Sequence, residues 1–325
     1  MASLLPIEIN LTAVIMAVQA DEPLVYASSA GDGLPQGLPS GPFDPLNHRT
    51  LELGLRGFAQ DQAGLELGYV EQLYTFGDRG RTVADSQPAD ALPSPHIVSI
   101  GYLALTRIFP GATDPSNFLP LYAFFPWEDW RGGKPAVLER DILPALARWA
   151  AGNGPDHGSA DRRALSRKER IALHFGSDGV SFDEEKVLER YELLYDAGLV
   201  EEALRDRRLP PSSLPVKLGQ AMAFDHRRIL ATALGRIRGK LKYRPVIFEM
   251  MPETFTLTDL QRKVEAISGH HLHKQNFRRL VETGGLVEPT GGQTTTGGRP
   301  AALFRFRREV LTERPAPGLR LGRSG

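Results

Sequence analysis

Residues 256–280 read TLTDLQRKVEAISGHHLHKQNFRRL, and this stretch decides the fold of the C-terminal part of the chain. Thr256 and Asp259 stand at the spacing of a capping box, with Asp in place of Glu, and an apolar stripe follows at helical intervals. A turn containing Gly269 separates this helix from a second one. The apolar face of the second helix is formed by Phe277, Leu280 and Val281. A helix, a tight turn and a polar, basic second helix predict a helix-turn-helix unit.

Two short strands are predicted after the second helix, at 286–288 and 301–306, with a Gly- and Thr-rich loop at 289–300 between them. This hairpin predicts a winged helix, whose second helix fits the major groove, where Lys, Arg, Gln and Asn donate to base edges. The residues that we expect to contact double-stranded DNA are His273, Lys274, Gln275, Asn276, Arg278 and Arg279 on the helix, and Thr295 and Arg299 on the wing. Winged helices also bind proteins, so an interaction scaffold is a further interpretation.

The chain of 325 residues has 39 basic and 39 acidic residues, but these charges are unevenly distributed. Residues 1–150 hold 9 Lys/Arg and 17 Asp/Glu, a net charge of −8, whereas residues 216–325 hold 20 and 9, a net charge of +11. A basic module joined to an acidic one is typical of a polyanion-binding protein. A solvated basic face is the alternative that charge alone leaves open.

The chain has no cysteine, and 41% of its residues are apolar. Disulfides, thiolate metal sites and cysteine nucleophiles are therefore excluded, and a reducing cytoplasm is the expected compartment. No run of 18 apolar residues is present, so we expect no membrane insertion. His270, His271 and His273 lie close together in sequence, but they lack carboxylate or cysteine partners nearby. We interpret them as polar surface histidines and expect no metal site.

The N-terminal part alternates between strand and helix signals. Strands are predicted at 7–18, 69–76, 96–108 and 119–125, a helix at 50–63 that stops at Gly64, and a loop at 31–45. This order indicates a mixed α/β domain. Amphipathic helices without recognisable chemistry are predicted at 136–151, 166–174 and 183–204, and a longer helix at 216–241.

Several ordered blocks in the last third of the chain resemble the Nudix-related transcriptional regulators of NAD metabolism, the NrtR family. They are Ala223-Phe224-Asp225-His226, Phe255-Thr256-Leu257, Asn276-Phe277-Arg278-Arg279 and Gly298-Arg299-Pro300-Ala301. The stretch Glu71–Asp78 also looks like the Nudix-like domain of that family. The resemblance covers 5–130 and 216–308, while 132–215 looks like an insertion. The length is more similar to the NadQ-type repressors of NAD synthesis.

The resemblance implies an α+β multidomain fold: a Nudix-like α/β/α sandwich with a helical insertion, followed by a winged helix-turn-helix domain. The expected segments are a ligand-sensing domain at 1–131, the insertion at 132–215, a linking or closing helix at 216–241, the winged helix at 242–310 and a flexible tail at 311–325. The implied function is that of a homodimeric repressor of NAD synthesis or salvage genes, which binds double-stranded operator DNA.

A catalytic Nudix helix presents several glutamates to Mg²⁺, which polarises a diphosphate and activates water. If the motif is anchored on Gly64, its four glutamate positions hold Arg49, Phe58, Asp61 and Gln62. A single carboxylate remains, so we predict no enzyme activity and no catalytic residues. A Nudix hydrolase of ADP-ribose or a related nucleoside diphosphate derivative is the alternative.

The Nudix-like domain is instead expected to bind an adenine nucleotide effector, NAD, ADP-ribose or ATP, with no other cofactor required. Guanidinium groups match phosphate oxygens, and aromatic rings can stack on adenine. The candidate ligand contacts are Arg49, Arg56, Arg79 and Arg81 for phosphates, and Phe43, Tyr74 and Phe76 for the base. Tyr74 and Phe76 also alternate like the core residues of a strand.

Overall fold

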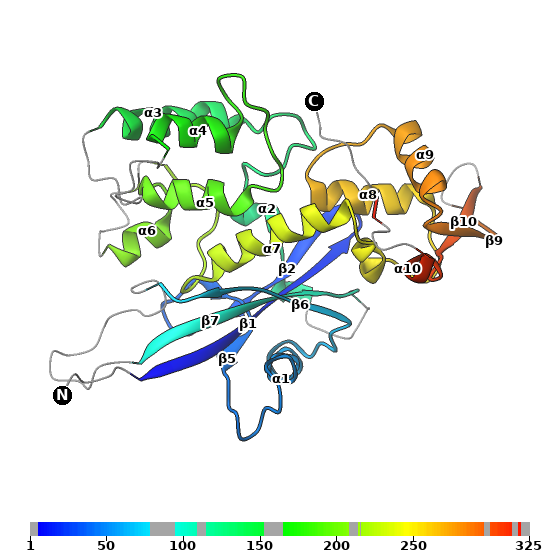
Figure 1. The fold of residues 1–325 in the computed structure, drawn as a ribbon, viewed down its shortest axis with the longest axis horizontal. Coiled ribbons are helices and arrows are strands. Elements are labelled where there is room, and N and C mark those ends of the chain that lie inside the picture. Colours follow the sequence, from blue (N-terminus) through cyan, green and yellow to red (C-terminus); the bar gives the residue numbers. More distant parts are fainter. Residues whose placement is uncertain are drawn as a thin grey trace.

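A central sheet is covered by helices on both faces, and a winged helix stands beside them (Figure 1). The computed structural model describes residues 6–78, 95–108, 115–152, 165–207, 214, 216–295, 300–313 and 318–319. Within these ranges no helix is long and apolar enough to cross a membrane.

The sheet has six strands in the order β6-β7-β1-β2-β8, with β5 pairing to part of β1. Its strands are β1 (Ile7–Gln19), β2 (Glu22–Tyr26), β5 (Ser40–Pro42), β6 (Tyr69–Phe76), β7 (His96–Leu105) and β8 (Phe118–Pro120). β1 and β7 run parallel, and the other pairs are antiparallel. β3 (Ser28–Ser29) and β4 (Gln36–Gly37) form a small separate sheet. The strands predicted at 7–18 and 69–76 are confirmed, and the strand predicted at 96–108 is present but ends at Leu105.

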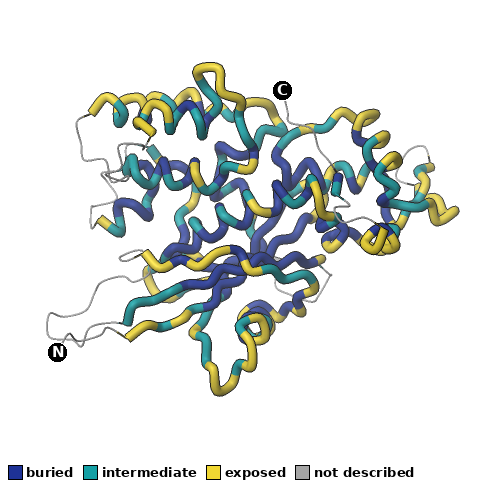
Figure 2. Tube along the Cα trace, in the orientation of Figure 1, coloured by how far each residue is buried: buried dark blue, intermediate teal, exposed yellow. Residues whose placement is uncertain are grey.

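The strand β1 shows why both faces of the sheet are covered. Successive side chains of a strand point to opposite faces, and Leu11 to Val18 are all buried. Ala13 and Ile15 pack toward the helix α1 (Leu51–Ala63), whereas Val14 and Met16 belong to the core on the other face. Figure 2 shows this buried centre between the two layers. The result is a sandwich with one core on each side of the sheet.

The helix α1 (Leu51–Ala63) covers one face of the sheet and is defined at both ends by its sequence. The Thr50 hydroxyl accepts a hydrogen bond from the backbone N–H of Leu53 at 3.2 Å. Gly64 ends the helix in the left-handed conformation, with φ of +64°, which glycine adopts without strain. The predicted helix with its Gly64 stop is confirmed.

The other face carries two further layers of helices. α7 (His226–Leu241) lies directly on the sheet, and the helices of the insertion pack on α7 through α5 (Val187–Asp196) (Figure 1). The insertion and the segment before it contain α2 (Leu121–Phe124), a π-helical turn (Leu138–Ile142), α3 (Leu143–Ala151), α4 (Arg167–Phe175), α5 (Val187–Asp196) and α6 (Glu201–Asp206). A single hydrophobic cluster joins the sheet, the insertion, α7 and the winged helix.

The winged helix follows α7. Its elements are a 3-10 helix (Val246–Met250), α8 (Leu257–Ser268), α9 (Lys274–Gly284), β9 (Val287–Thr294), β10 (Ala301–Phe306) and α10 (Val310–Glu313). The predicted capping box is present: Thr256 accepts from the Asp259 N–H at 3.1 Å, and the Asp259 carboxylate accepts from the Thr256 N–H at 3.1 Å. Phe255 adds a backbone bridge to Phe304 of β10.

Two predictions for the N-terminal part are wrong. The stretch 119–125 is not one strand, because β8 ends at Pro120 and Leu121–Phe124 form α2. An apolar run fits a buried strand and a buried helix equally well. The predicted loop 31–45 contains β4 and β5, and β5 pairs with β1 as an antiparallel neighbour in the sheet. Local composition does not reveal such a pairing.

Two helices of the second half have other bounds than predicted. The stretch 183–204 forms two helices, α5 and α6, separated near Gly198, whose φ is +70°. α7 begins at His226 and not near residue 216. The chain before it approaches α2 so closely that a Cβ at Gly219 would lie 2.6 Å from the carbonyl oxygen of Phe124.

The end of the chain also differs from the prediction. β9 extends to Thr294, into the predicted loop 289–300, because it pairs with β10 as far as Ala301. Leu319, in the tail expected to be flexible, is buried, and its N–H donates to the carbonyl of Leu241 at 2.9 Å. The tail is therefore packed at this residue.

His226, the first residue of α7, predicts a pH dependence of stability. Its buried Nδ1 accepts a hydrogen bond from the Leu38 N–H at 2.9 Å, and burial lowers the pKa of His226 to about 3. The unfolded chain therefore binds the proton more readily below about pH 6.5, so the folded state loses stability as the pH falls from about 6.5 toward 3. His226 alone should account for about 2 kcal/mol between pH 7 and pH 5.

Urea unfolding of the wild type and of His226→Gln at the two pH values measures this contribution. The wild type should lose stability on acidification, and His226→Gln should lose about 2 kcal/mol less. His271→Gln is the matched control, because the His271 side chain is 69% exposed. An equal pH dependence in His226→Gln and the wild type would contradict the prediction.

Candidate nucleic-acid interface and ligand site

The helix α9 presents its polar and basic side chains to solvent. Phe277 and Val281 are its buried residues, and they fix the helix against the core of the winged helix. The six residues predicted to contact DNA in this segment are all exposed: His273, Lys274, Gln275, Asn276, Arg278 and Arg279. Lys274 and Arg278 are four residues apart, so they share one face of the helix. The structure thus brings the predicted helix residues together on one surface.

The cations of α9 differ from those of α7. Lys274, Arg278 and Arg279 form no ion pair with any residue in the described ranges. In α7, Arg227 and Arg238 are buried and paired with carboxylates. The net charge of +11 therefore overstates the charge available to a partner, because two of its arginines lie inside the core.

Residues of α8 form part of the contacts that hold the turn between α8 and α9. Gly269 ends α8 with φ of +76°. The Glu265 carboxylate accepts a hydrogen bond from the Leu272 N–H at 2.8 Å and lies 3.2 Å from Nδ1 of His271. The Gln261 amide donates to the Leu272 carbonyl at 2.8 Å. Hydrogen bonds within the helix-turn-helix therefore stabilise the start of α9.

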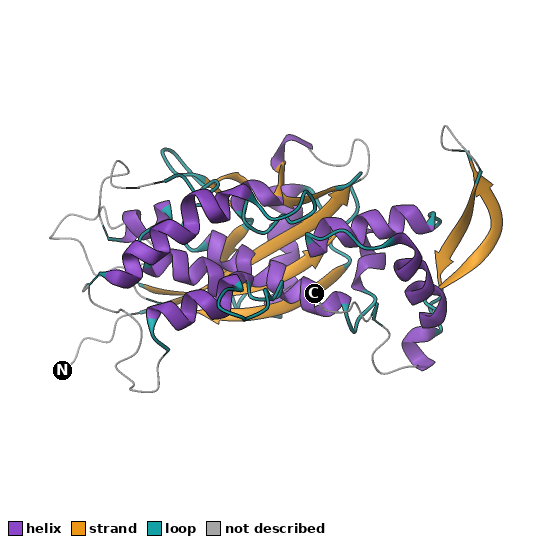
Figure 3. Cartoon of the chain, turned by 90° about the horizontal axis from the view of Figure 1, so that it is seen from above, coloured by secondary structure: helices purple, strands orange, loops and turns teal. Residues whose placement is uncertain are grey.

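The wing is the hairpin of β9 and β10, which projects from the rest of the molecule (Figure 3). Thr294 pairs with Ala301 near the tip. Thr295 is exposed directly after β9. Arg299, the other predicted wing contact, lies outside the described residues.

The sheet separates the aromatic residues predicted to bind a nucleotide base. Phe43 packs against the core on the α1 face, whereas Phe76 is buried in the core on the α7 face. The Arg228 guanidinium lies 5.2 Å from the centre of the Phe76 ring. Tyr74 is 61% exposed, and its ring stands edge-on to Phe76 at 5.3 Å. Tyr74 is therefore the most accessible of the three rings.

The predicted phosphate contacts also differ in their surroundings. Arg56 bonds to the carbonyl oxygens of Leu67 and Gly68 and pairs with Glu52 at 2.9 Å, so it ties α1 to the chain that leads into β6. Arg49 is exposed and has no ion pair among the described residues. Arg79 and Arg81 lie outside the described residues.

Two of the four Nudix glutamate positions are occupied by residues that contact a neighbouring segment of the chain. The ring of Phe58 fills the space next to Gly41, where an added Cβ would lie 2.5 Å from it. The Gln62 amide binds the backbone of Ser40 twice, at 3.1 and 2.8 Å. Asp61 is exposed. In the parts of the chain that the structure describes, no cluster of three His, Asp or Glu side chains could hold a metal ion.

A buried charge cluster was not anticipated from the sequence. Glu128 lies between Arg190 of α5 and Arg238 of α7, with N–O distances of 2.6 and 2.7 Å, and all three side chains are almost fully buried. Burial alone would raise the pKa of Glu128, but the two arginines outweigh burial and hold the pKa below its ordinary value. The three residues are far apart in sequence, so no local pattern indicates them.

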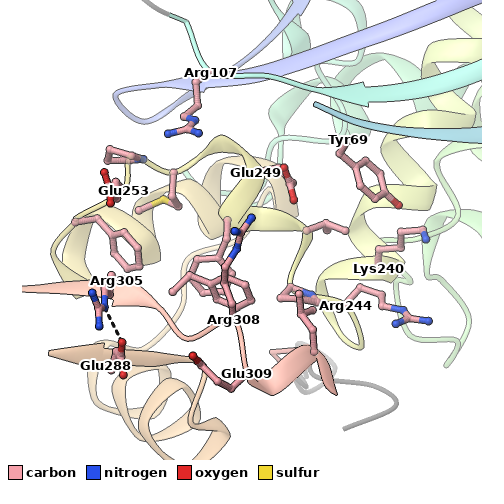
Figure 4. A pocket seen from close by; sticks show the side chains of 18 of the residues that line it. Tyr69, Arg107, Lys240, Arg244, Glu249, Glu253, Glu288, Arg305, Arg308 and Glu309 are labelled. Carbon is pink, nitrogen blue, oxygen red and sulfur yellow. Dashed lines mark hydrogen bonds and ion pairs between the residues drawn. The ribbon is translucent and has the colours of Figure 1, made fainter. Parts of the chain in front are cut away.

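A cavity of about 1110 Å³ was not anticipated either. It opens between the edge strand β6, the end of α7 and the wing (Figure 4). The charged residues that line it are Arg107, Lys240, Arg244, Arg305 and Arg308, and Glu71, Glu249, Glu253, Glu288 and Glu309. The numbers of cations and carboxylates are equal, so the lining charge gives no preference for an anionic ligand.

Comparison with known proteins assigns the C-terminal domain. Residues 247–306 match the family described as the NrtR DNA-binding winged helix domain. A segment of 85 residues is 44% identical to the ADPR responsive transcriptional repressor NtrR of Acinetobacter baylyi. That segment covers 26% of this chain and 34% of the relative, about a third of its length.

Solved structures agree in overall fold. Shewanella oneidensis NrtR complexed with a 27mer DNA has a TM-score of 0.52 and 18% identity, over 94% of this chain and 95% of that one. A second crystal structure of Shewanella oneidensis NrtR has a TM-score of 0.50 and 18% identity, over 93% of this chain and 95% of that one. The predicted fold class, a Nudix-like sandwich with an insertion followed by a winged helix, is confirmed. The C-terminal blocks that resemble the NrtR family in sequence lie in the part of the chain that matches its winged helix domain.

The buried cluster predicts a large difference between two Glu→Gln substitutions. Glu128→Gln removes the charge that two buried arginines share, and breaking such a buried pair costs about 3–5 kcal/mol. Glu139→Gln removes an exposed carboxylate, 2.9 Å from Lys134, and should cost less than about 1 kcal/mol. Urea unfolding at pH 7 measures both. Equal losses of unfolding free energy in the two variants would contradict the claim that Glu128 stabilises the fold through its buried arginines.

Proposed function

We propose that this chain is a transcriptional repressor that binds double-stranded operator DNA through α9 and the wing, and that ADP-ribose regulates it through the Nudix-like domain. The observation that carries the proposal is the exposed, unneutralised basic surface of α9 in a domain that matches a DNA-binding family. We include in the proposal that the repressor is a homodimer and that its targets are genes of NAD synthesis or salvage, as the family resemblance implies.

The chemistry of α9 supports DNA binding. Lys274 and Arg278 share a helix face, and Gln275 and Arg279 occupy the neighbouring positions one turn apart. These side chains supply the donors that read guanine and adenine edges in the major groove. Cations that neutralise phosphates also release counterions, which makes the affinity dependent on salt. The Shewanella protein of the same fold is described in complex with DNA, which supports the same role here.

The identity of the effector rests on the named relative. The Acinetobacter protein is described as ADPR responsive, which favours ADP-ribose over NAD or ATP as the effector of this chain. Among the predicted phosphate contacts we favour Arg49, because it is exposed and forms no ion pair with a carboxylate in the described ranges. Phe58 and Gln62 pack where a hydrolase needs glutamates, so we propose binding without hydrolysis.

The recognition helix is tested with a double variant, Lys274→Ala plus Arg278→Ala. Affinity for a duplex from the promoter of the chain's own gene should fall, and the slope of log affinity against log salt should decrease by about 0.9 for each lost phosphate contact. Fluorescence anisotropy at several salt concentrations measures both.

The matched control for α9 is Lys134→Ala plus Arg140→Ala, which removes two exposed cations from the insertion. This control should bind the duplex like the wild type. If the α9 variant folds normally and keeps both the affinity and the salt slope of the wild type, the assignment of α9 to DNA is wrong.

ADP-ribose should bind the chain without being turned over. Calorimetry should detect binding, and Arg49→Ala should weaken it by about tenfold, because a hydrogen bond to a charged group contributes about 1.5–3 kcal/mol. Arg148→Ala, another exposed arginine, is the control. With Mg²⁺ present, product formation should stay far below about 1 s⁻¹, a low value for an enzyme.

The hydrolase alternative makes the opposite prediction for the same assay. Turnover at about 1 s⁻¹ or faster, lost in Asp61→Ala but kept in Asp32→Ala, would establish a catalytic carboxylate. In that case the non-catalytic role of the Nudix-like domain would be refuted.

A further inference from the structure

The turn that precedes the recognition helix is held by residues from outside the winged helix. The backbone N–H of Trp130 donates to the Gly269 carbonyl at 2.7 Å. The His270 ring lies 5.7 Å from the Trp130 ring and 6.2 Å from the Phe182 ring, and Trp130 and Phe182 are 4.5 Å apart. His270, expected as a surface histidine, is therefore packed among rings from two other segments. One of these, Phe182, belongs to the insertion.

The position of Phe182 is itself fixed. The Arg190 guanidinium lies 4.3 Å from the centre of the Phe182 ring and donates to the carbonyl oxygens of Asp183 and His174, at 2.7 and 3.1 Å. Gly176 passes so close that a Cβ there would lie 2.6 Å from the backbone nitrogen of Phe182. These contacts hold the loop between α4 and α5 in place at Phe182, whose ring packs against the helix-turn-helix.

The residues that hold Phe182 are also connected with the end of α8. Glu128, which holds Arg190, also holds Arg238, and Arg238 donates to the Ile267 carbonyl at 3.1 Å. The Glu128 carbonyl lies so close to Gly269 that an added Cβ would be 2.5 Å from it. The last turn of α8 and the first residues of the turn therefore rest on a surface built by the insertion and by the segment before it.

We propose that Phe182 and Arg190 are positioning residues for the recognition helix, so that the insertion holds α9 in the orientation in which it meets DNA. The inference rests on the proposed DNA-binding function. α9 begins four residues after His270, so a shift of the turn moves the whole helix. The insertion, whose helices showed no chemistry in the sequence, acts through this contact.

A second phenylalanine of the insertion separates positioning from stability. Phe175 of α4 is 6% exposed and packs in the hydrophobic core, whereas Phe182 is only partly buried but contacts His270. Phe175→Ala should therefore lower the urea midpoint more than Phe182→Ala. The order should be reversed for DNA binding, because Phe182 packs against the turn and Phe175 packs in the core.

The experiment compares full-length wild type, Phe182→Ala and Phe175→Ala. Hydrogen exchange of the backbone amides at 270–273 is measured without DNA, and anisotropy with the promoter duplex of the chain's own gene is measured across salt concentrations. Phe182→Ala should accelerate exchange at the turn and weaken binding by about five- to tenfold, at the low end of typical coupling between sites. Its salt slope should stay unchanged, because the phosphate contacts remain. Phe182→Tyr, which keeps the ring, should restore both.

Phe175→Ala should leave the turn exchange and the affinity of folded protein at wild-type values. If the two alanine variants change exchange and affinity equally, or if Phe182→Ala changes neither, the positioning role is refuted. If the wild type binds no DNA, the proposed function fails instead, and unaltered turn exchange in Phe182→Ala would still refute the anchoring of the turn.

Discussion

The carboxylate of Glu128, shared by two buried arginines, is the interaction on which the arrangement of the chain depends. Arg190 comes from the insertion and Arg238 from α7, so three segments must meet before both arginines are paired with Glu128. Charges removed from water are tolerated only when the geometry and the additional hydrogen bonds are good. The Ile267 carbonyl and the carbonyl of Glu128 itself supply such bonds to Arg238.

This cluster joins the Nudix-like sandwich to the winged helix. Tyr122 donates to the Ala266 carbonyl at 2.7 Å, and Lys263 of α8 donates to the carbonyl of Val18 at the end of β1, at 2.6 Å. α9 is therefore connected to the sandwich through α8. A ligand can change DNA affinity only if it favours one arrangement of such contacts over another. The contacts around Glu128 and Lys263 connect the sandwich with α8.

The sequence predicted the winged helix well because its signals are local. Thr256 and Asp259 cap α8, and Gly269 ends it, so both the start and the end of the helix can be recognised from adjacent residues. The residues that contact a nucleotide are harder to predict from the sequence. The face of the sheet on which a side chain lies depends on how its strand pairs with distant strands. Phe43 and Phe76 illustrate this, since the sheet lies between them. Their assignment as ligand contacts stays a prediction.

The central claim is that a nucleotide bound to the sandwich controls the DNA-reading helix, and thermodynamic linkage tests it most directly. ADP-ribose is titrated calorimetrically into the chain alone and into the chain saturated with its promoter duplex. The account predicts dissociation constants that differ by about 5- to 150-fold, and the same factor when DNA affinity is measured with and without ADP-ribose. Equal dissociation constants for ADP-ribose in the two titrations, or no binding in either, would contradict it.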